Sequence, residues 1–331
     1  MSENIQLKRV VLEVIGSCNY TCKMCPQTNP GRGSEWKRKM PLNQFEEILS
    51  QIVPKYGHPQ INLEGSGEPT LAKDLYKYVE LVKKYDCKAY IYTNGANLHG
   101  SYMKQLIDSG IDFIRVSVIG YNPIIYYEWM NCHNFSSVLN NVIRMQDYIQ
   151  QSGSETEVSS YHLITDNRRV DQEIQEYQNN FINRAQTKAY IWKMHNWSGN
   201  YATGINSRSG DKRVSCGRPF SPELTVRAGG NSGQTGAVTP CCQTLGPPNE
   251  SKSVLGHFSE QSFEEIFWGK KYNELRKAHE EKRFDDIEYC KNCDFLYDNP
   301  EVLVWTNDKE AKTYHMLGTD FSLRDNIIAS C

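Results

Sequence analysis

Residues 16–25 read Gly16-Ser17-Cys18-Asn19-Tyr20-Thr21-Cys22-Lys23-Met24-Cys25, and they follow directly on an apolar stretch from Val10 to Ile15. The three cysteines have the spacing C-x3-C-x2-C. Thiolates are soft ligands that favour iron–sulfur clusters and zinc, and a four-iron cluster normally takes four of them. Three thiolates in one compact loop therefore suggest a cluster with one iron left open. An open coordination position is typical of catalytic rather than structural metal sites.

Spacing alone leaves two other interpretations of these cysteines open. They could form half of a zinc site, with the remaining Cys or His ligands coming from later in the chain. They could also be unrelated thiols that happen to lie close together.

Length and composition bound the class of protein. The chain has 331 residues, 39% hydrophobic and 23% charged, which suffices for one large α/β domain and a smaller module. Its net charge of −2 argues against a nucleic-acid or anionic-membrane partner. We expect neither a signal peptide nor a membrane-spanning helix, because no apolar run is long enough. Eleven cysteines without an export signal favour a reducing cytoplasmic location, where clustered thiols usually bind metal.

Strand-like apolar runs alternate with helix-period segments through about the first 195 residues. The expected strands cover residues 10–15, 61–63, 89–92, 113–118, 158–164 and 188–194. The expected helices cover residues 43–53, 71–85, 102–109, 136–149 and 170–183. Such alternation favours parallel β/α crossovers. Six units are too few for the eight-fold barrel, so the pattern predicts an α/β fold with a partial (β/α)6 barrel of the TIM type over residues 1–195.

The remainder of the chain has a different composition. Residues 196–213 are rich in Ser, Gly, Asn and Arg, which predicts a linker or an active-site loop. Residues 214–296 predict a small α+β module with a hairpin, Glu223–Ala228 and Ala237–Pro240, followed by a helix over 262–281. The tail, residues 297–331, has no strong period.

A second motif, Glu64-Gly65-Ser66-Gly67-Glu68-Pro69, follows the expected strand at 61–63. Glycines let a ligand approach the backbone closely, and the carboxyl end of a parallel sheet is where ligands bind. Glu68 would supply one negative charge, which suits an ammonium group. A run of this kind, taken by itself, usually predicts only a turn. Here it follows the cysteine loop by one β/α unit, and the two motifs together indicate a binding site.

With these two motifs, the first 195 residues or so resemble the radical S-adenosylmethionine (SAM) enzymes. In that family a C-x3-C-x2-C loop after the first strand holds a [4Fe–4S] cluster. The resemblance implies that Cys18, Cys22 and Cys25 hold this cluster here. It also implies that the open iron chelates the amino and carboxylate groups of SAM.

The resemblance further implies a set of SAM contacts. The family motif Gly-Gly-Glu-Pro, which binds the SAM amino group, is matched by Gly67-Glu68-Pro69, with Ser66 in place of the first glycine. Thr93-Asn94-Gly95 matches a pattern near the adenosyl group, and Ser117 lies where a ribose contact is common, although Ile119 replaces the acidic residue that often follows. The expected contacts with SAM are Met24, Gly65, Ser66, Gly67, Glu68, Pro69, Thr93, Asn94 and Ser117.

The later cysteines form a second group, in which Cys216 is followed by the doublet Cys241-Cys242 and by the pair Cys290-x2-Cys293. From spacing alone a structural zinc site with four thiolates is about equally well supported. The segment resembles the SPASM/Twitch extension of radical SAM enzymes, which implies one auxiliary [4Fe–4S] cluster. Its ligands would be Cys216, Cys241, Cys290 and Cys293. Cys242 remains an alternative to Cys241, which is favoured because it follows Pro240.

Other residues carry weaker expectations. Cys87 is expected to be a buried thiol. The aromatic segment 126–133 is expected to form a packed loop or a substrate lid. His195, just after the sixth strand, is a candidate acid/base residue. Arg218 and Arg227 could bind a substrate anion or could be surface charges.

Taken together, the resemblance implies an enzyme whose reduced cluster cleaves SAM to methionine and a 5′-deoxyadenosyl radical that abstracts hydrogen from the substrate. An electron donor such as flavodoxin or ferredoxin would be its partner. A small molecule, such as a sugar or aminocyclitol undergoing dehydrogenation or epimerisation, is favoured because only nine residues precede the first strand. The alternatives are a maturase of a ribosomally made peptide and a zinc-stabilised binding protein without redox chemistry.

Overall fold

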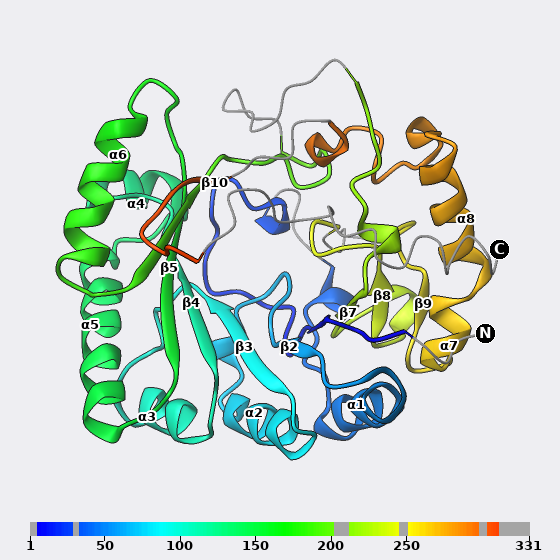
Figure 1. Cartoon of the computed structure of the whole chain (residues 1–331), viewed down its shortest axis with the longest axis horizontal. Coiled ribbons are helices and arrows are strands. Elements are labelled where there is room, and N and C mark those ends of the chain that lie inside the picture. Colours follow the sequence, from blue (N-terminus) through cyan, green and yellow to red (C-terminus); the bar gives the residue numbers. More distant parts are fainter. Residues whose placement is uncertain (1–4, 29–32, 202–211, 245–250, 298–302, 311–331) are drawn as a thin grey trace.

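The structure is a computed structural model that describes residues 5–28, 33–201, 212–244, 251–297 and 303–310. Its strands form one sheet in the order β10-β6-β5-β4-β3-β2-β1-β7-β8-β9 (Figure 1). The first six strands are β1 (Arg9–Leu12), β2 (Gln60–Asn62), β3 (Lys88–Thr93), β4 (Phe113–Ser117), β5 (Glu157–Leu163) and β6 (Lys188–Trp192). They are parallel neighbours in chain order. This arrangement confirms the predicted partial barrel of six β/α units.

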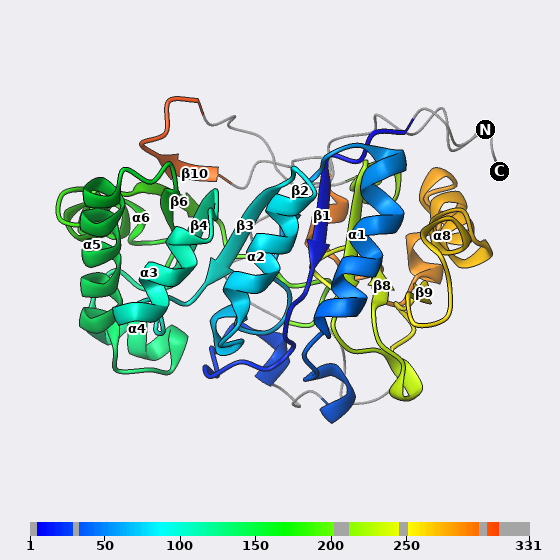
Figure 2. The same cartoon turned by 90° about the horizontal axis from the view of Figure 1, so that it is seen from below.

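Helices connect these strands and cover one face of the sheet, which is clearest for α1, α2 and α3 in Figure 2. They are α1 (Leu42–Tyr56), α2 (Leu75–Lys84), α3 (Gly100–Asp108), α4 (Pro123–Met130), α5 (Phe135–Ser152) and α6 (Val170–Tyr177). Each buries apolar side chains at helical spacing, as α2 does with Leu75, Tyr78, Val79 and Val82.

Strand residues alternate between the helix-covered face and the interior of the barrel. In β4, Ile114 and Val116 are fully buried, whereas Phe113, Arg115 and Ser117 are only partly buried. In β3, Ala89 and Ile91 are buried while Tyr90 and Tyr92 are partly exposed. Because successive strand residues point to opposite faces, the odd-numbered residues of β4 and the two tyrosines of β3 all face the barrel interior.

The predicted hairpin is confirmed as β7 (Glu223–Arg227) and β8 (Ala237–Thr239), which pair antiparallel. β7 also pairs in parallel with β1, so the cysteine-bearing segment continues the barrel sheet. A short strand, β9 (Gly256–His257), completes this side. The two halves of the chain therefore share one sheet.

Several predicted boundaries were wrong. The helix expected over 262–281 is two helices, α7 (Phe263–Phe267) and α8 (Lys270–Glu280), because Gly269 has an extended backbone. The helix expected over 71–85 begins only at Leu75, after a short turn at Pro69–Leu71. The segment 126–133 is mostly α4 rather than a loop.

Within the tail, residues 303–306 form a strand that the sequence did not predict, because β10 (Leu303–Thr306) pairs antiparallel with the edge strand β6. Cys331 lies outside the described residues. Within the described part of the chain, no helix combines the length and the hydropathy that crossing a membrane would require.

Candidate active site

The loop that carries Cys18, Cys22 and Cys25 follows β1 and is held by the chain segments around it. The Glu68 amide donates to the Ser17 carbonyl at 2.8 Å. The Asn94 side-chain amide donates to Asn19 Oδ1 at 2.9 Å, and the Lys23 amide donates to the Trp129 carbonyl at 2.8 Å. The cysteine loop is therefore fixed by the ends of β2 and β3 and by α4.

The glycines of the second motif are required by close packing. A Cβ atom on Gly67 would lie 2.0 Å from the Ile15 carbonyl oxygen, and one on Gly65 would lie 2.1 Å from Glu13 Oε2. Glu13 is itself fully buried. The motif thus sits directly against the start of the cysteine loop, as expected if both contact one ligand.

Ser66, which replaces a glycine of the family motif, has a specific partner. Its amide and its hydroxyl both donate to Glu13 Oε2 at 2.5 Å. Glu13 Oε1 accepts the amide of Ala228, the residue directly after β7, at 3.2 Å. Glu13 therefore ties the motif to the neighbouring strand, a role that the sequence analysis did not identify.

Glu68 is 3% exposed, and its carboxylate binds other protein groups. Oε1 accepts hydrogen bonds from the Thr70 amide at 3.1 Å and from the hydroxyls of Thr70 and Thr93, both at 2.6 Å. Oε2 accepts the Asn94 amide at 2.7 Å. Burial raises the pKa of Glu68, and these hydrogen bonds oppose the rise. The carboxylate thus positions the end of β3, and only Oε2 retains capacity for a further donor.

We predict that Glu68→Ala weakens SAM binding about tenfold or more, because hydrogen bonds to a charged group are worth about 1.5–3 kcal/mol. It should also lower the melting temperature, since the Thr70 and Asn94 amides would lose their buried acceptor. Equilibrium binding of SAM to the reconstituted chain checks this. Glu47→Ala, on the exposed face of α1, is the control. Unchanged affinity at normal iron content would mean that the motif is only a turn.

The three thiols of the loop fit a multi-iron core. Burial raises the pKa of Cys18 to about 12, and the neighbouring Glu68 and Cys25 also raise it. Burial likewise raises the pKa of Cys22, with Cys25 and Cys18 contributing. Thiolates crowded in this way need the positive charge of bound metal.

The expected SAM contacts fall into two groups. Gly67, Glu68 and Asn94 lie against the cysteine loop through the contacts above, and Thr93 joins them through its hydrogen bond to Glu68. Gly65 and Ser117 instead line a cavity inside the barrel. Met24 and Pro69 are buried, Met24 within the hydrophobic core.

Thiols of the second group of cysteines lie close enough to one another to influence each other's pKa. Burial raises the pKa of Cys290, and the neighbouring thiols of Cys216, Cys241 and Cys293 raise it further. Burial also raises the pKa of Cys293, to which Cys216 and Cys241 contribute. The turn 290–293 is closed by the Cys293 amide, which donates to the Cys290 carbonyl at 2.8 Å. These four thiols, drawn from three separate segments, suit one auxiliary cluster.

Cys242 faces a different environment from Cys241. It lines the barrel cavity and lies close enough to influence the pKa of Arg9 and of Tyr161. It is absent from the thiols that act on Cys290 and Cys293. We therefore expect Cys241 rather than Cys242 to be the ligand.

This difference gives a matched pair of variants. Cys241→Ser should lose about four irons per chain, because a four-iron cluster normally needs four thiolates. Cys242→Ser should retain all of them. Iron analysis after anaerobic reconstitution checks the prediction, and the reverse result would make Cys242 the ligand.

Arg218 and Arg227 are buried rather than surface charges, at 7% and 0% exposure. Arg227 Nη2 donates to the carbonyls of Cys242 and Thr244, both at 3.1 Å, and Nη1 lies 3.5 Å from Glu13 Oε2. Arg227 therefore supports the doublet through Nη2, whereas its buried Nε and Nη1 atoms make no hydrogen bond among the described residues. Cys87 is a buried thiol, as predicted.

A cavity of about 420 Å³ lies inside the barrel. Its walls are aromatic, and the rings belong to Tyr90, Tyr92, Phe113, Tyr161 and Trp192. Gly65, Ser117 and His195 line it near the carboxyl ends of the strands, and Cys242 and Gln243 line it from the auxiliary side. Arg115 projects into it from β4 and was missed by the sequence analysis. One cavity is therefore lined by expected SAM contacts and by Cys242 and Gln243, which directly follow the expected auxiliary ligand Cys241.

His195 is 7% exposed, and its Nδ1 accepts the Trp197 amide at 3.4 Å. In the neutral ring this bond leaves the proton on Nε2. The position of His195 at the cavity agrees with the predicted acid/base role, which remains a prediction.

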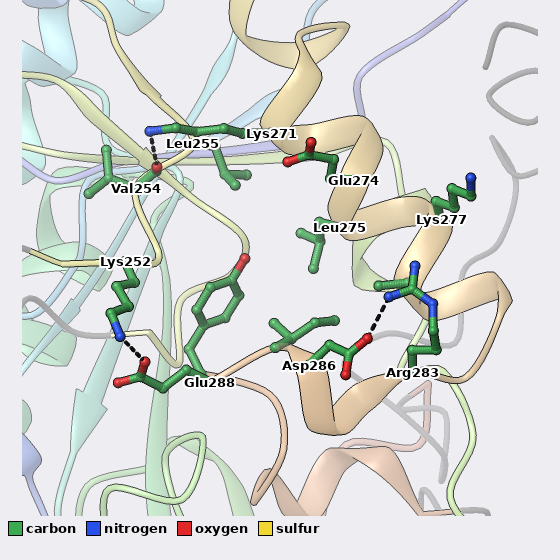
Figure 3. Close-up of a pocket in the computed structure, with 13 residues that line it drawn as sticks. Lys252, Val254, Leu255, Lys271, Glu274, Leu275, Lys277, Arg283, Asp286 and Glu288 are labelled. Atoms are coloured by element: carbon green, nitrogen blue, oxygen red, sulfur yellow. Dashed lines mark hydrogen bonds and ion pairs between the residues drawn. The ribbon is translucent and has the colours of Figure 1, made fainter.

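A larger cavity, of about 700 Å³, lies beside α8 (Figure 3). Its charged side chains are largely paired with one another, since Lys252 binds Glu288 and Arg283 binds Asp286, both at 2.6 Å. Lys271 donates to the Val254 carbonyl at 3.2 Å. The predicted SAM contacts and cysteine ligands do not line it, so we do not assign the chemistry to it.

Comparison with known proteins supports this arrangement. The sequence profile of the radical SAM superfamily matches residues 12–167, and that of an iron–sulfur cluster-binding domain, SPASM, matches residues 233–294. A probable GTP 3′,8-cyclase of Thermococcus kodakarensis is 29% identical over 133 residues, which are 40% of this chain and 41% of that protein. The chain thus matches about two fifths of the length of this relative.

Two solved structures share the fold. BtrN in complex with AdoMet and 2-DOIA aligns with a TM-score of 0.60 at 20% identity, over 94% of this chain and 98% of that chain. SuiB of Streptococcus suis, bound to precursor peptide SuiA, aligns with a TM-score of 0.61 at 14% identity, over 82% of this chain and 67% of that one.

These matches make the protein an enzyme whose cofactors are SAM and [4Fe–4S] clusters, so the interpretation as a zinc-stabilised binding protein without redox chemistry is wrong. The chain thus contains a radical SAM domain at residues 12–167 and a C-terminal SPASM iron–sulfur domain at residues 233–294.

Proposed function

We propose that this enzyme abstracts a hydrogen atom from a small molecule bound in the barrel cavity, and so dehydrogenates or epimerises a sugar- or aminocyclitol-like metabolite. The observation that carries the proposal is the cavity itself. Ser117 and Gly65, both expected SAM contacts, line it together with Cys242, the neighbour of an expected auxiliary ligand. A substrate in this space would contact both halves of the catalytic machinery.

The size and lining of the cavity suit a small molecule. Its volume of about 420 Å³ lies within the roughly 300–1,000 Å³ typical of small-molecule sites. Aromatic walls with a few polar groups are also typical of such sites. A sugar or cyclitol ring would fill this space, whereas a peptide would need an extended groove.

The residues of the chain have distinct roles in this proposal. Cys18, Cys22 and Cys25 would hold the first cluster, which when reduced supplies the electron that splits SAM into methionine and the 5′-deoxyadenosyl radical that takes hydrogen from the substrate. Glu68 orders the end of β3, the aromatic walls exclude water, and His195 exchanges a proton at Nε2.

The auxiliary module is assigned one cluster, held by Cys216, Cys241, Cys290 and Cys293. It would either accept an electron from the substrate or bind the substrate directly. Cys242 and Gln243 link it to the cavity, because they line the cavity directly after Cys241. A flavodoxin or ferredoxin would deliver electrons. Thiolate-held clusters need a reducing compartment, so we place the enzyme in the cytoplasm.

A peptide is the second candidate substrate. Among the similar solved structures, SuiB was solved with a precursor peptide, whereas BtrN was solved with 2-DOIA. The matched part of the GTP 3′,8-cyclases covers only about two fifths of their length and adds no substrate assignment.

A labelling experiment tests the proposal. The reconstituted enzyme is incubated with SAM, a reductant and either the deuterated metabolite fraction or the deuterated peptide fraction of cells grown in heavy water. Deuterium should appear in 5′-deoxyadenosine, measured by mass spectrometry, only with the metabolite fraction. Transfer from the peptide fraction alone would replace this proposal with a peptide maturase.

A further inference from the structure

Arg115 lies in the barrel cavity with aromatic rings around its guanidinium. Its Cζ atom is 4.4 Å from the centre of the Tyr92 ring and 5.3 Å from that of Tyr190. The rings of Phe113, Tyr161 and Trp192 are each 5.8 Å away. Ring faces attract a cation, but they do not satisfy the in-plane N–H groups of a guanidinium.

Among the described residues, those N–H groups have no other acceptor. The Arg115 side chain makes no hydrogen bond and no ion pair there, although arginine carries five N–H donors. Its Nε atom is enclosed and unsatisfied. The two terminal nitrogens are not among the enclosed atoms, so they are open to the cavity.

Unmet donors also occur elsewhere on the cavity wall. The Nε atom of Arg9 and the Nε1 atom of Trp192 are buried without an acceptor, and both residues line the same cavity. Buried donors are normally paired. Three wall residues that each keep at least one donor atom without an acceptor indicate an occupant rich in acceptor oxygens.

We infer that the substrate carries a carboxylate, which binds the guanidinium of Arg115 inside the barrel cavity. This inference rests on the proposed function and narrows its substrate class to an acidic sugar or cyclitol. A guanidinium stacked on Tyr92 keeps its edge free, and that edge binds a carboxylate through two parallel hydrogen bonds.

The charges around the cavity favour a carboxylate over a phosphate. Arg9 is already paired, because its Nη2 atom donates to Glu223 Oε2 at 2.6 Å. Glu64 also lines the cavity, but among the described residues it forms no ion pair with Arg115, and its Oε1 atom accepts the Asn62 side-chain amide at 3.0 Å. A single guanidinium without an ion-pair partner suits the single charge of a carboxylate.

The opposite side of the cavity offers an acceptor. Gln243 is 8% exposed, lines the cavity, and has an unsatisfied Oε1 atom. Such an atom accepts a hydroxyl or an ammonium group. An acidic sugar has both features, a carboxylate for Arg115 and hydroxyls for Gln243.

Calorimetric titration of the reconstituted, SAM-loaded full chain tests the inference with three probes. They are glucuronate, the neutral glucose and glucose 6-phosphate. We expect glucuronate to bind at least about tenfold more tightly than glucose, as a charge-assisted hydrogen bond allows. Arg115→Gln should remove this preference, and Arg115→Lys should keep only part of it, because lysine lacks the planar fork. Arg144→Gln, at an exposed position of α5, should retain it.

Equal binding of glucuronate and glucose by the wild-type chain would overturn the inference, and this comparison needs no variant to fold. A preference that survives in a folded Arg115→Gln variant would also overturn it. Tighter, Arg115-dependent binding of glucose 6-phosphate would overturn the choice of a carboxylate. Deuterium transfer from a neutral metabolite in the labelling experiment would refute this inference alone and leave the proposed function standing.

Discussion

Replacement of Cys18, Cys22 and Cys25 together by alanine is expected to lower the iron content of the reconstituted chain from about eight to about four per chain and to abolish SAM cleavage. The three thiols lie in one loop, and burial raises the pKa of Cys18 and of Cys22, so metal must supply the charge that stabilises them as thiolates. The auxiliary ligands come from other segments and should retain their cluster. Iron analysis and 5′-deoxyadenosine formation are the measurements.

Cys87→Ala is the matched control for this variant. Cys87 is buried between α2 and β3, outside both groups of cysteines. It should leave both iron content and SAM cleavage unchanged. Stoichiometric zinc without iron in the wild-type chain would contradict the account, as would full SAM cleavage by the triple variant.

Replacement of Cys290 and Cys293 by alanine is expected to remove about four irons per chain and abolish turnover, while reductive SAM cleavage continues. The expected SAM contacts all precede residue 120 and lie at the carboxyl ends of β1 to β4. The auxiliary thiols are held by the segments around η5 (Arg218–Phe220), β8 and η8 (Asp294–Leu296). The two cofactor sites are therefore separable by mutation.

The same variant distinguishes the two roles of the auxiliary cluster. If the cluster accepts an electron, the variant should still move deuterium from the labelled metabolite fraction into 5′-deoxyadenosine, but without oxidised product. If the cluster binds the substrate, that transfer should vanish as well. Full product formation without the second cluster would leave the module as structural support.

Much of the barrel could be predicted from sequence because its signals are local. Buried parallel strands read as short apolar runs, and the cysteine loop and the glycine motif each follow one of them. Since ligand loops in β/α folds gather at the carboxyl ends of strands, Cys18, Glu68 and Asn94 could be placed together before the structure was known. The hairpin was also local, because a glycine-rich turn joins its strands.

Long-range pairing could not be predicted in the same way. Nothing in residues 303–306 identifies β6 as their partner, and nothing in residues 223–227 identifies β1, because pairing depends on tertiary packing. The break between α7 and α8 was missed because one glycine inside a periodic helix is often tolerated.

The direction of individual side chains in the site also could not be predicted from the sequence. Cys241 and Cys242 lie in a turn after β8, where the alternation of strand residues does not tell which of the two faces the auxiliary group. Arg115 did carry a signal, since a charged residue inside a buried parallel strand is expensive unless it has a partner. That signal was overlooked.

A structure of the reconstituted chain with SAM bound tests the central claim most directly, namely that one barrel cavity joins the two cofactor sites. We predict one cluster on Cys18, Cys22 and Cys25, a second on Cys216, Cys241, Cys290 and Cys293, and the 5′-carbon of SAM facing the cavity that Arg115 and Ser117 line. A 5′-carbon directed away from this cavity, or a cavity closed off from SAM by protein side chains, would contradict the account.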